Sequence, residues 1–302
     1  MSQQPDSEPD RDGATRGGAA IADALREGSD ALREASVEEP RREAATLLGA
    51  TIARDRAFLV AHSDEALAPD ALELFRERVR RRAAGEPAQY ITGRQEFYGL
   101  EFEVGPAVLI PRPETELLVE TALELLRGVG GPRLCDVGTG SGCVAVALLH
   151  ERADARAVAV DISADALAVA ARNAARHAVA DRLALVASDC FDALDPARHR
   201  FDLVASNPPY VAEGDLAGLQ REVREHEPRA ALTPGGDGLR VIRRLLEDAP
   251  RFLRGGGWLV FEIGYDQHEA VRRLVDARVW SLLDIRRDLQ GIPRTVVLRL
   301  DG

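Results

Sequence analysis

The chain has 302 residues, 45% of them hydrophobic, and a formal net charge of −11 in which every basic residue is an arginine. This composition can fill the cores of two domains, whereas no apolar run approaches the ~20 residues that span a bilayer and the first residues lack the parts of a signal peptide. The three cysteines show no Cys-x-x-Cys spacing and the histidines are scattered, so we expect a soluble cytoplasmic protein without a disulfide framework or a metal centre.

The first third of the chain predicts a polar tail, a helical bundle and a linker. Residues 1–18 are polar and rich in Pro, Gly and Asp, and we expect them to be disordered. From 19 to 86, apolar residues recur at helical spacing in four short stretches, which predicts a small bundle. The last stretch ends in Arg80–Arg82, which we interpret as a solvated helix face; contact with an acidic partner or ribosomal RNA is the alternative. Residues 87–112 alternate in the manner of a β-hairpin and predict a linker.

The remainder, residues 113–302, alternates between helical and extended patterns. That order is typical of a mostly parallel, Rossmann-like α/β sheet. We expect the last two strands to form an antiparallel edge. The seven predicted strands lie near 133–137, 157–161, 183–187, 201–206, 257–263, 281–286 and 294–300.

A glycine loop follows the first of these strands. It reads Gly138-Thr139-Gly140-Ser141-Gly142 and opens a helical stretch, so backbone and helix N–H groups can approach a ligand closely. A dinucleotide site would place its third glycine one position later, where Cys143 stands, so the spacing favours a smaller ligand. Asp161 ends the next strand about 20 residues on and can accept hydrogen bonds from ribose hydroxyls. These features predict an adenosine-containing cofactor; the alternative is a plain glycine turn and a surface Asp.

The fourth strand ends in an unusual loop, Asn207-Pro208-Pro209-Tyr210. Two consecutive prolines cannot extend a sheet, and they lack N–H groups, so the loop presents carbonyl oxygens beside the side-chain oxygen of Asn207. This cluster of acceptors stands at the carboxyl end of a strand, where open α/β sheets bind ligands. It suits a planar NH₂ group, on which Tyr210 offers a face to stack. The alternative is a strand that ends in a Pro-rich turn.

These motifs resemble those of class I S-adenosylmethionine-dependent methyltransferases that modify planar nitrogen in adenine, cytosine, guanine or glutamine. Further stretches, in the same order along the chain, resemble the protein-(glutamine-N5) methyltransferases of peptide chain release factors. The resemblance runs from about residue 20 to the C-terminus. The stretches that carry it are 87–93, 97–100, 109–116, 226–232, 236–239 and 262–265.

The resemblance implies S-adenosyl-L-methionine as the cofactor. Gly138 through Gly142 would surround its methionine end, Asp161 would hold the ribose, and Asn207 would stand beside it. Cys190 lies where the family contacts adenine and often has an aromatic residue. Phe191 is the candidate to compensate for that difference.

The resemblance also implies the substrate, the glutamine of the Gly-Gly-Gln loop of class I release factors, with the helical bundle gripping the rest of the factor. We expect the Asn207 side-chain oxygen and the Pro208 carbonyl to accept the two amide hydrogens, with Pro209 and Tyr210 completing the substrate site.

Three alternatives remain. A glutamine methyltransferase of a ribosomal protein is disfavoured by the stretch 112–116. A nucleic-acid adenine or guanine methyltransferase is disfavoured by the acidic charge, because phosphate neutralisation supplies most non-specific affinity. A non-catalytic adaptor is disfavoured by the intact Gly138, Asp161 and Asn207.

Overall fold

The structure is a computed structural model that describes residues 19–301, so the predicted disordered tail, 1–18, lies outside the described residues. The chain divides into two compact units between Thr92 and Gly93. No helix within the described range is long and apolar enough to cross a membrane.

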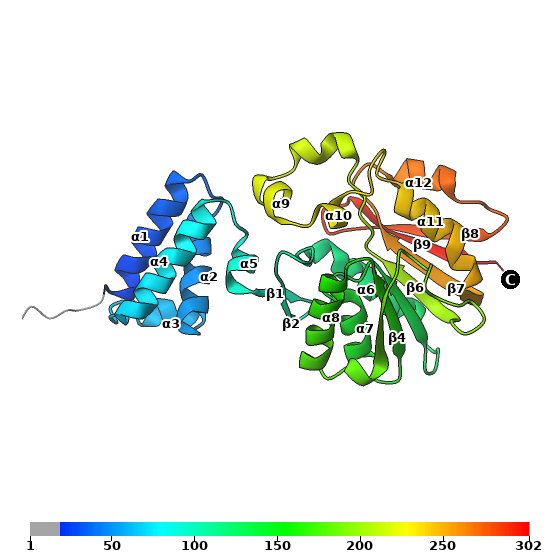
Figure 1. The fold of residues 1–302 in the computed structure, drawn as a ribbon, viewed down its shortest axis with the longest axis horizontal. Helices are drawn as coiled ribbons and strands as arrows, with labels where there is room; N and C mark the ends of the chain where they lie inside the picture. Colours follow the sequence, from blue (N-terminus) through cyan, green and yellow to red (C-terminus); the bar gives the residue numbers. More distant parts are fainter. Residues whose placement is uncertain (1–18, 302) are drawn as a thin grey trace, which may run out of the picture. The chain divides into compact units, whose positions relative to one another are not determined.

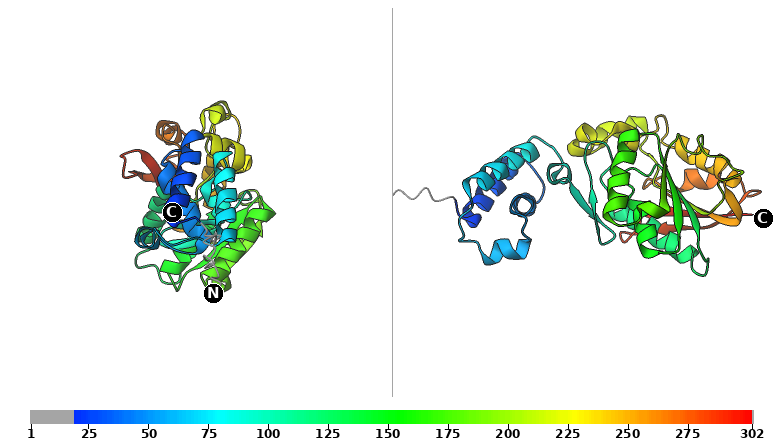
Figure 2. Two further views of the ribbon diagram at one scale, coloured as in Figure 1. Left: turned by 90° about the vertical axis from the view of Figure 1, so that its left-hand side faces the viewer. Right: turned by 60° about the horizontal axis from the view of Figure 1, so that its bottom comes forward.

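The first unit is helical, as the apolar spacing predicts, and is drawn blue to cyan in Figures 1 and 2. Its largest buried side chains include Leu32, Leu47, Leu48 and Phe75. Pro at the first helical position begins both α2 and α4, where the missing N–H costs no hydrogen bond. The helices are α1 (Ile21–Glu34), α2 (Pro40–Ile52), α3 (Arg56–Ala61), α4 (Pro69–Ala83) and α5 (Ala88–Thr92).

The arginine run at the end of α4 is only partly solvated. Arg82 is buried and donates to Glu43 of α2, so the interpretation of the whole run as a solvated face is wrong at this residue. Arg81 pairs with Glu86 on the following turn. Helical periodicity places Arg82 on the same side as the apolar residues of α4, and the charge is retained there because a carboxylate meets it.

The predicted hairpin linker, 87–112, contains a hairpin that is shorter than expected. Strands β1 (Arg94–Phe97) and β2 (Leu100–Glu103) pair antiparallel through a turn at Tyr98 and Gly99, both of which have positive φ. The residues before it form α5, whose Ile91 is buried in the core of the helical unit. A short apolar run fits a strand or a helical turn equally well, and packing decides here for the helix.

The second unit is built on a seven-stranded sheet with the strand order β5-β4-β3-β6-β7-β9-β8. Its first five strands run parallel, and β9 is antiparallel to both of its neighbours. This confirms the predicted fold class and the antiparallel edge. The strands are β3 (Arg133–Val137), β4 (Arg156–Asp161), β5 (Leu183–Ala187), β6 (Phe201–Ser206), β7 (Leu253–Glu262), β8 (Trp280–Arg287) and β9 (Pro293–Leu300).

Helices cover both faces of this sheet (Figures 1 and 2). Successive strand residues point to opposite faces, so Leu134 joins the core with α6 (Glu116–Leu125), α7 (Cys143–Glu151) and α8 (Ala164–Arg176). Its neighbour Cys135 joins the core with α11 (Arg240–Asp248) and α12 (His268–Leu274). The shorter helices are η1 (Pro113–Thr115), η2 (Ala180–Arg182), η3 (Glu213–Gly218), α9 (Arg221–His226), α10 (Arg229–Leu232) and η4 (Ala249–Arg251).

The strand order fixes where a ligand can bind. β3 comes first in the sequence among these strands, yet it lies between β4 and β6. The chain therefore turns outward in both directions at β3, which is the topological switch point of an open α/β sheet. The carboxyl ends of β3, β4 and β6, where the glycine loop, Asp161 and Asn207 stand, meet at that point.

Candidate active site

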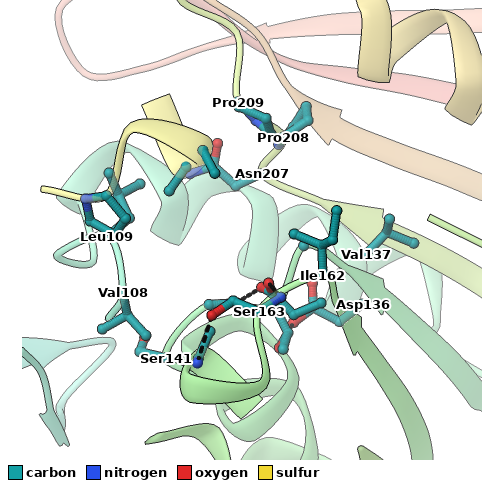
Figure 3. A pocket seen from close by; sticks show the side chains of 18 of the residues that line it. Val108, Leu109, Asp136, Val137, Ser141, Ile162, Ser163, Asn207, Pro208 and Pro209 are labelled. Carbon is teal, nitrogen blue, oxygen red and sulfur yellow. Dashed lines mark hydrogen bonds between the residues drawn. The ribbon is translucent and has the colours of Figure 1, made fainter. Parts of the chain in front are cut away.

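A cavity of about 310 Å³ opens at this switch point. Figure 3 shows Val108 and Leu109 on one side of it, Asn207 and the two prolines on another, and the loops after β3 and β4 beneath. The cavity brings together most of the sequence-predicted residues, while Gly142 and Tyr210 do not line it. Those that do are Gly138, Thr139, Gly140, Ser141, Asp161, Cys190, Asn207, Pro208 and Pro209.

The glycines of the loop have two different tasks. Gly138 and Gly140 have φ of +74° and +55°, and a Cβ at either would meet no atom within 4 Å. Both therefore need the backbone freedom of glycine and face open space, which fits a ligand that approaches the backbone closely. Gly142 has φ of +81°, and its Cβ would lie 3.1 Å from the Cβ of Ala170. The third glycine thus lets α7 and α8 come together.

Asp161 holds the glycine loop in place. Its Oδ2 accepts the Gly140 N–H at 2.8 Å and its Oδ1 accepts the Ser163 N–H at 2.9 Å. Each carboxylate oxygen can accept a further hydrogen bond, so both remain able to receive ribose hydroxyls. With the open space before the glycines, these residues fit an adenosine cofactor, although the individual contacts remain predictions.

Asn173, which the sequence analysis missed, supports the same loop. It is fully buried on α8, donates to the Ser141 carbonyl at 2.9 Å and to the Glu103 carbonyl at 3.0 Å, and accepts the Glu103 N–H at 2.7 Å. An amide on the apolar side of an alanine-rich helix is the signal that could have found it, because a buried amide needs partners.

Of the two residues expected near the adenine ring, the structure places one at the cavity and the other away from it. Cys190 lines the cavity with φ of +50°, and burial raises the pKa of its thiol to about 11, so it stays protonated. Phe191 does not line the cavity; its ring stacks on Phe252 with centroids 4.8 Å apart. The idea that Phe191 compensates for Cys190 is therefore wrong, because its side chain packs in the core beneath α11.

Asn207 belongs to a hydrogen-bonded network. Its Nδ2 donates to Thr115 Oγ1 at 2.9 Å, and the Thr115 hydroxyl donates to Glu262 Oε2 at 2.7 Å. The Tyr210 hydroxyl donates to the other oxygen, Glu262 Oε1, at 3.3 Å. Tyr210 therefore faces Glu262, and its predicted contact with a substrate remains a prediction. Thr115 and Glu262 stand inside the stretches that carried the resemblance, but nothing in their types marked them as partners of Asn207.

The backbone of the Asn207–Tyr210 loop is held from behind. Gln267 donates its Nε2 to the Tyr210 carbonyl at 2.8 Å and accepts the Gly264 N–H on its Oε1 at 2.9 Å. Gly238, with φ of +78°, lies so close that a Cβ there would overlap the Tyr210 carbonyl. The loop is thus fixed by a side-chain clamp and a tight glycine contact.

Glu227 joins two walls of the cavity. Its carboxylate is buried and accepts hydrogen bonds from the Ile110 N–H, at 3.2 Å, and from the Arg112 guanidinium. Residues from 107–112 and from 228–233 line the cavity on either side of this ion pair. A buried charge is costly unless it is paired, so this contact fixes the two segments together.

Two buried carboxyls near the cavity hold their protons unusually tightly. Burial raises the pKa of Glu262 to about 7, against the opposing effect of the Thr115 and Tyr210 hydroxyls and Arg294. Burial likewise raises the pKa of Asp136 to about 6, although the Thr139 hydroxyl and the Ala145 N–H favour its ionised form. Neither residue was singled out from the sequence.

Comparisons with known proteins agree with this architecture. Residues 23–93 match the family model "PrmC N-terminal domain" and residues 113–251 match "Methyltransferase small domain". A release factor glutamine methyltransferase from Nitratidesulfovibrio vulgaris is 45% identical over 91% of this chain and 93% of its own length. One from Cereibacter sphaeroides is 44% identical over 92% of this chain and 98% of its own.

The chain belongs to the release factor glutamine methyltransferase family. A solved protein-(glutamine-N5) methyltransferase from Alicyclobacillus acidocaldarius is 31% identical over 67% of this chain and 100% of its own, with a TM-score of 0.40. The hMettl16 catalytic domain, at 18% identity over 74% of this chain and 82% of its own, has a TM-score of 0.53 and shares the fold. Membership in a methyltransferase family also confirms S-adenosyl-L-methionine as the predicted cofactor.

Gly140→Val should abolish cofactor binding. The substitution forces a β-branched residue into a left-handed backbone conformation and fills the open space before the loop. Isothermal titration calorimetry with S-adenosyl-L-methionine measures the effect. Gly130→Val, outside the cavity and with open space around its Cβ, is the control and should bind like the wild type. Normal affinity in Gly140→Val would show that the loop does not hold the cofactor.

The enzyme should lose stability as the pH rises from about 5 to about 7. The folded-state pKa of Glu262, about 7, lies above its ordinary value of 4.5. The native protein therefore binds this proton more tightly, and the resulting stabilisation is full below pH 4.5 and lost through pH 7. Each unit of pKa shift corresponds to about 1.4 kcal/mol, so a loss on the order of 1–3 kcal/mol is expected.

Urea unfolding of the cofactor-free enzyme at pH 5.5 and 7.5 measures this loss. Glu262→Gln removes the titrating group and keeps the shape of the side chain, so its free energy of unfolding should vary less with pH than that of the wild type. Equal pH dependence in the two proteins would mean that Glu262 titrates near its ordinary value.

Proposed function

We propose that this enzyme transfers the methyl group of S-adenosyl-L-methionine to the side-chain amide nitrogen of the glutamine in the Gly-Gly-Gln motif of class I peptide chain release factors. Its family supports the reaction, since curated relatives that align over nearly their whole length carry the name release factor glutamine methyltransferase. The single observation that carries the proposal for this chain is the orientation of Asn207 at the cavity, with its nitrogen engaged by Thr115.

That orientation suits an amide substrate. Because Nδ2 of Asn207 donates to Thr115, the remaining polar atom, Oδ1, is an acceptor available to a ligand. Pro208 has no N–H of its own, and its carbonyl provides a second acceptor on the same rigid loop. Two fixed acceptors match the two hydrogens of a primary carboxamide.

The chain's own residues then have a defined task. When bound, S-adenosyl-L-methionine supplies a methyl group on a positively charged sulfur, which is an electrophile. An amide nitrogen is a weak nucleophile because its lone pair is delocalised into the carbonyl. Asn207 and Pro208 would hold its two hydrogens, aim the nitrogen, and stabilise the positive charge that develops on it. No base is required before transfer, since the proton can leave afterwards.

The remaining parts of the proposal concern the partner and the compartment. We assign the helical unit, which matches the family's N-terminal domain model, to contact with the rest of the release factor. The three cysteines are free and buried, which suits a reducing compartment, and we propose that the enzyme acts in the cytoplasm. The acidic net charge fits a protein substrate better than a nucleic acid.

The decisive experiment is incubation with labelled S-adenosyl-L-methionine and a purified class I release factor. Wild-type Gly-Gly-Gln factor should accept one label, on the glutamine, and a Gly-Gly-Ala variant should accept none. A ribosomal protein preparation and total RNA serve as separate substrates in parallel. Label in either of these, with none in the release factor, would replace the proposed substrate.

Asn207→Ala should leave cofactor affinity within a few-fold of the wild type and lower kcat by about 100-fold or more, because a missing transition-state acceptor typically costs 10²–10³. Single-turnover methylation of the release factor and calorimetry with the cofactor separate the two effects. Unchanged turnover in this variant would remove Asn207 from the mechanism.

A further inference from the structure

The network behind Asn207 contains groups that the reaction as described does not use. Thr115 is 2% exposed and ends η1, and Glu262 is 1% exposed and ends β7. Thr115 lines the cavity, whereas Glu262 does not. Glu262 therefore cannot touch a ligand there directly, yet a carboxyl is kept in the core at the cost of desolvation.

When Glu262 is ionised, at a pH above its pKa of about 7, counting protons fixes the direction of every hydrogen bond in this network. An ionised carboxylate only accepts, and both oxygens of Glu262 receive a hydroxyl, one from Thr115 and one from Tyr210. The single proton of the Thr115 hydroxyl is thereby committed to Glu262. Thr115 Oγ1 can then only accept from Asn207, so the Asn207 atom that faces it must be the nitrogen.

The orientation of an Asn amide matters because its two ends have nearly the same shape and opposite polarity. A reversed Asn207 would turn its NH₂ toward the NH₂ of a carboxamide substrate and set two donors against each other. Packing alone discriminates poorly between the two orientations, whereas a partner that can only accept excludes the reversed one.

We propose that Thr115 and Glu262 are positioning residues that lock the amide of Asn207, so that its Oδ1 remains available to accept a hydrogen of the substrate amide. This inference rests on the proposed function and adds the reason why the acceptor keeps its orientation. Glu262 acts through Thr115, and Thr115 acts through Asn207. Tyr210 completes the set by donating to the second oxygen of Glu262, and burial raises the pKa of the Tyr210 hydroxyl, which keeps it a donor.

Thr115→Val tests the proposal, because valine has nearly the shape of threonine and no hydroxyl. We expect kcat for the release factor to fall about ten-fold or more, with the cofactor Kd and the KM for the factor within about three-fold of the wild type. Thr115→Ser restores the hydroxyl and should recover kcat to within about three-fold of the wild type.

Thr121→Val is the matched control. Thr121 is also fully buried, lies on the helix that follows η1, and its hydroxyl has no hydrogen bond within residues 19–301. Its kcat should equal that of the wild type. A Thr115→Val enzyme with normal kcat, or a Thr115→Ser enzyme as impaired as Thr115→Val, would overturn the proposal.

A double-mutant cycle shows whether Thr115 acts through Asn207. In an Asn207→Ala background, Thr115→Val should lower the residual single-turnover rate by less than two-fold, because no amide is left to orient. A full additional loss would assign Thr115 a separate role.

Glu262→Gln is the second variant. Because glutamine can donate as well as accept, kcat should fall several-fold with cofactor affinity retained. A wild-type kcat in this variant would overturn the assignment of Glu262.

A readout without turnover separates this inference from the proposed function. In ¹⁵N-labelled enzyme, the side-chain NH₂ signal of Asn207, assigned by its loss in Asn207→Ala, should exchange with solvent markedly faster in Thr115→Val than in wild type or Thr121→Val. Equal exchange would overturn the inference. If the wild type shows the slow exchange and yet methylates no release factor, the proposed substrate fails and the lock on Asn207 stands.

Discussion

The hydrogen bond between Asn207 and Thr115 is the interaction on which the chemistry of this site depends. It engages the amide nitrogen and so determines which atom of Asn207 is available at the cavity. The bond has a direction only because Glu262 takes the Thr115 proton. The buried carboxyl of Glu262, although costly to desolvate, thus fixes which end of the Asn207 amide faces Thr115. The shape of the Asn207 side chain alone does not fix this orientation.

The sheet makes this arrangement possible. β3 and β6 are adjacent, so the glycine loop and the Asn207 loop leave the same edge side by side, and the Ser206 hydroxyl ties the two strand ends together at 2.7 Å. Gln267 and Gly238 then fix the Asn207 loop from behind. The glycine loop and the Asn207 loop are therefore held by one rigid scaffold, which suits the proposed in-line transfer between two bound groups.

Much of this could be predicted from the sequence because it rests on local rules. Short apolar runs predict the strands of a parallel sheet, so the central strands β3 and β6 and the edge strand β5 lie where expected. The glycines at the start of β7 interrupt its apolar pattern, so its first residues were not predicted. The glycine loop and the proline loop could be located from the sequence because glycine and proline each have distinctive backbone conformations. The hydrogen-bond partners of Asn207 could not be predicted in this way, since Thr115 lies 92 residues away from Asn207 and Glu262 lies 147 residues from Thr115. The prediction that Phe191 compensates for Cys190 was wrong because tertiary packing decides which way a side chain faces.

Asn173 has a consequence beyond holding a loop. It bonds at once to the hairpin strand β2 and to the Ser141 carbonyl of the glycine loop. A movement of either segment would therefore break a hydrogen bond of one buried amide and leave a polar group unsatisfied in the core, which is costly. The position of the glycine loop and the position of the hairpin thus depend on the same side chain.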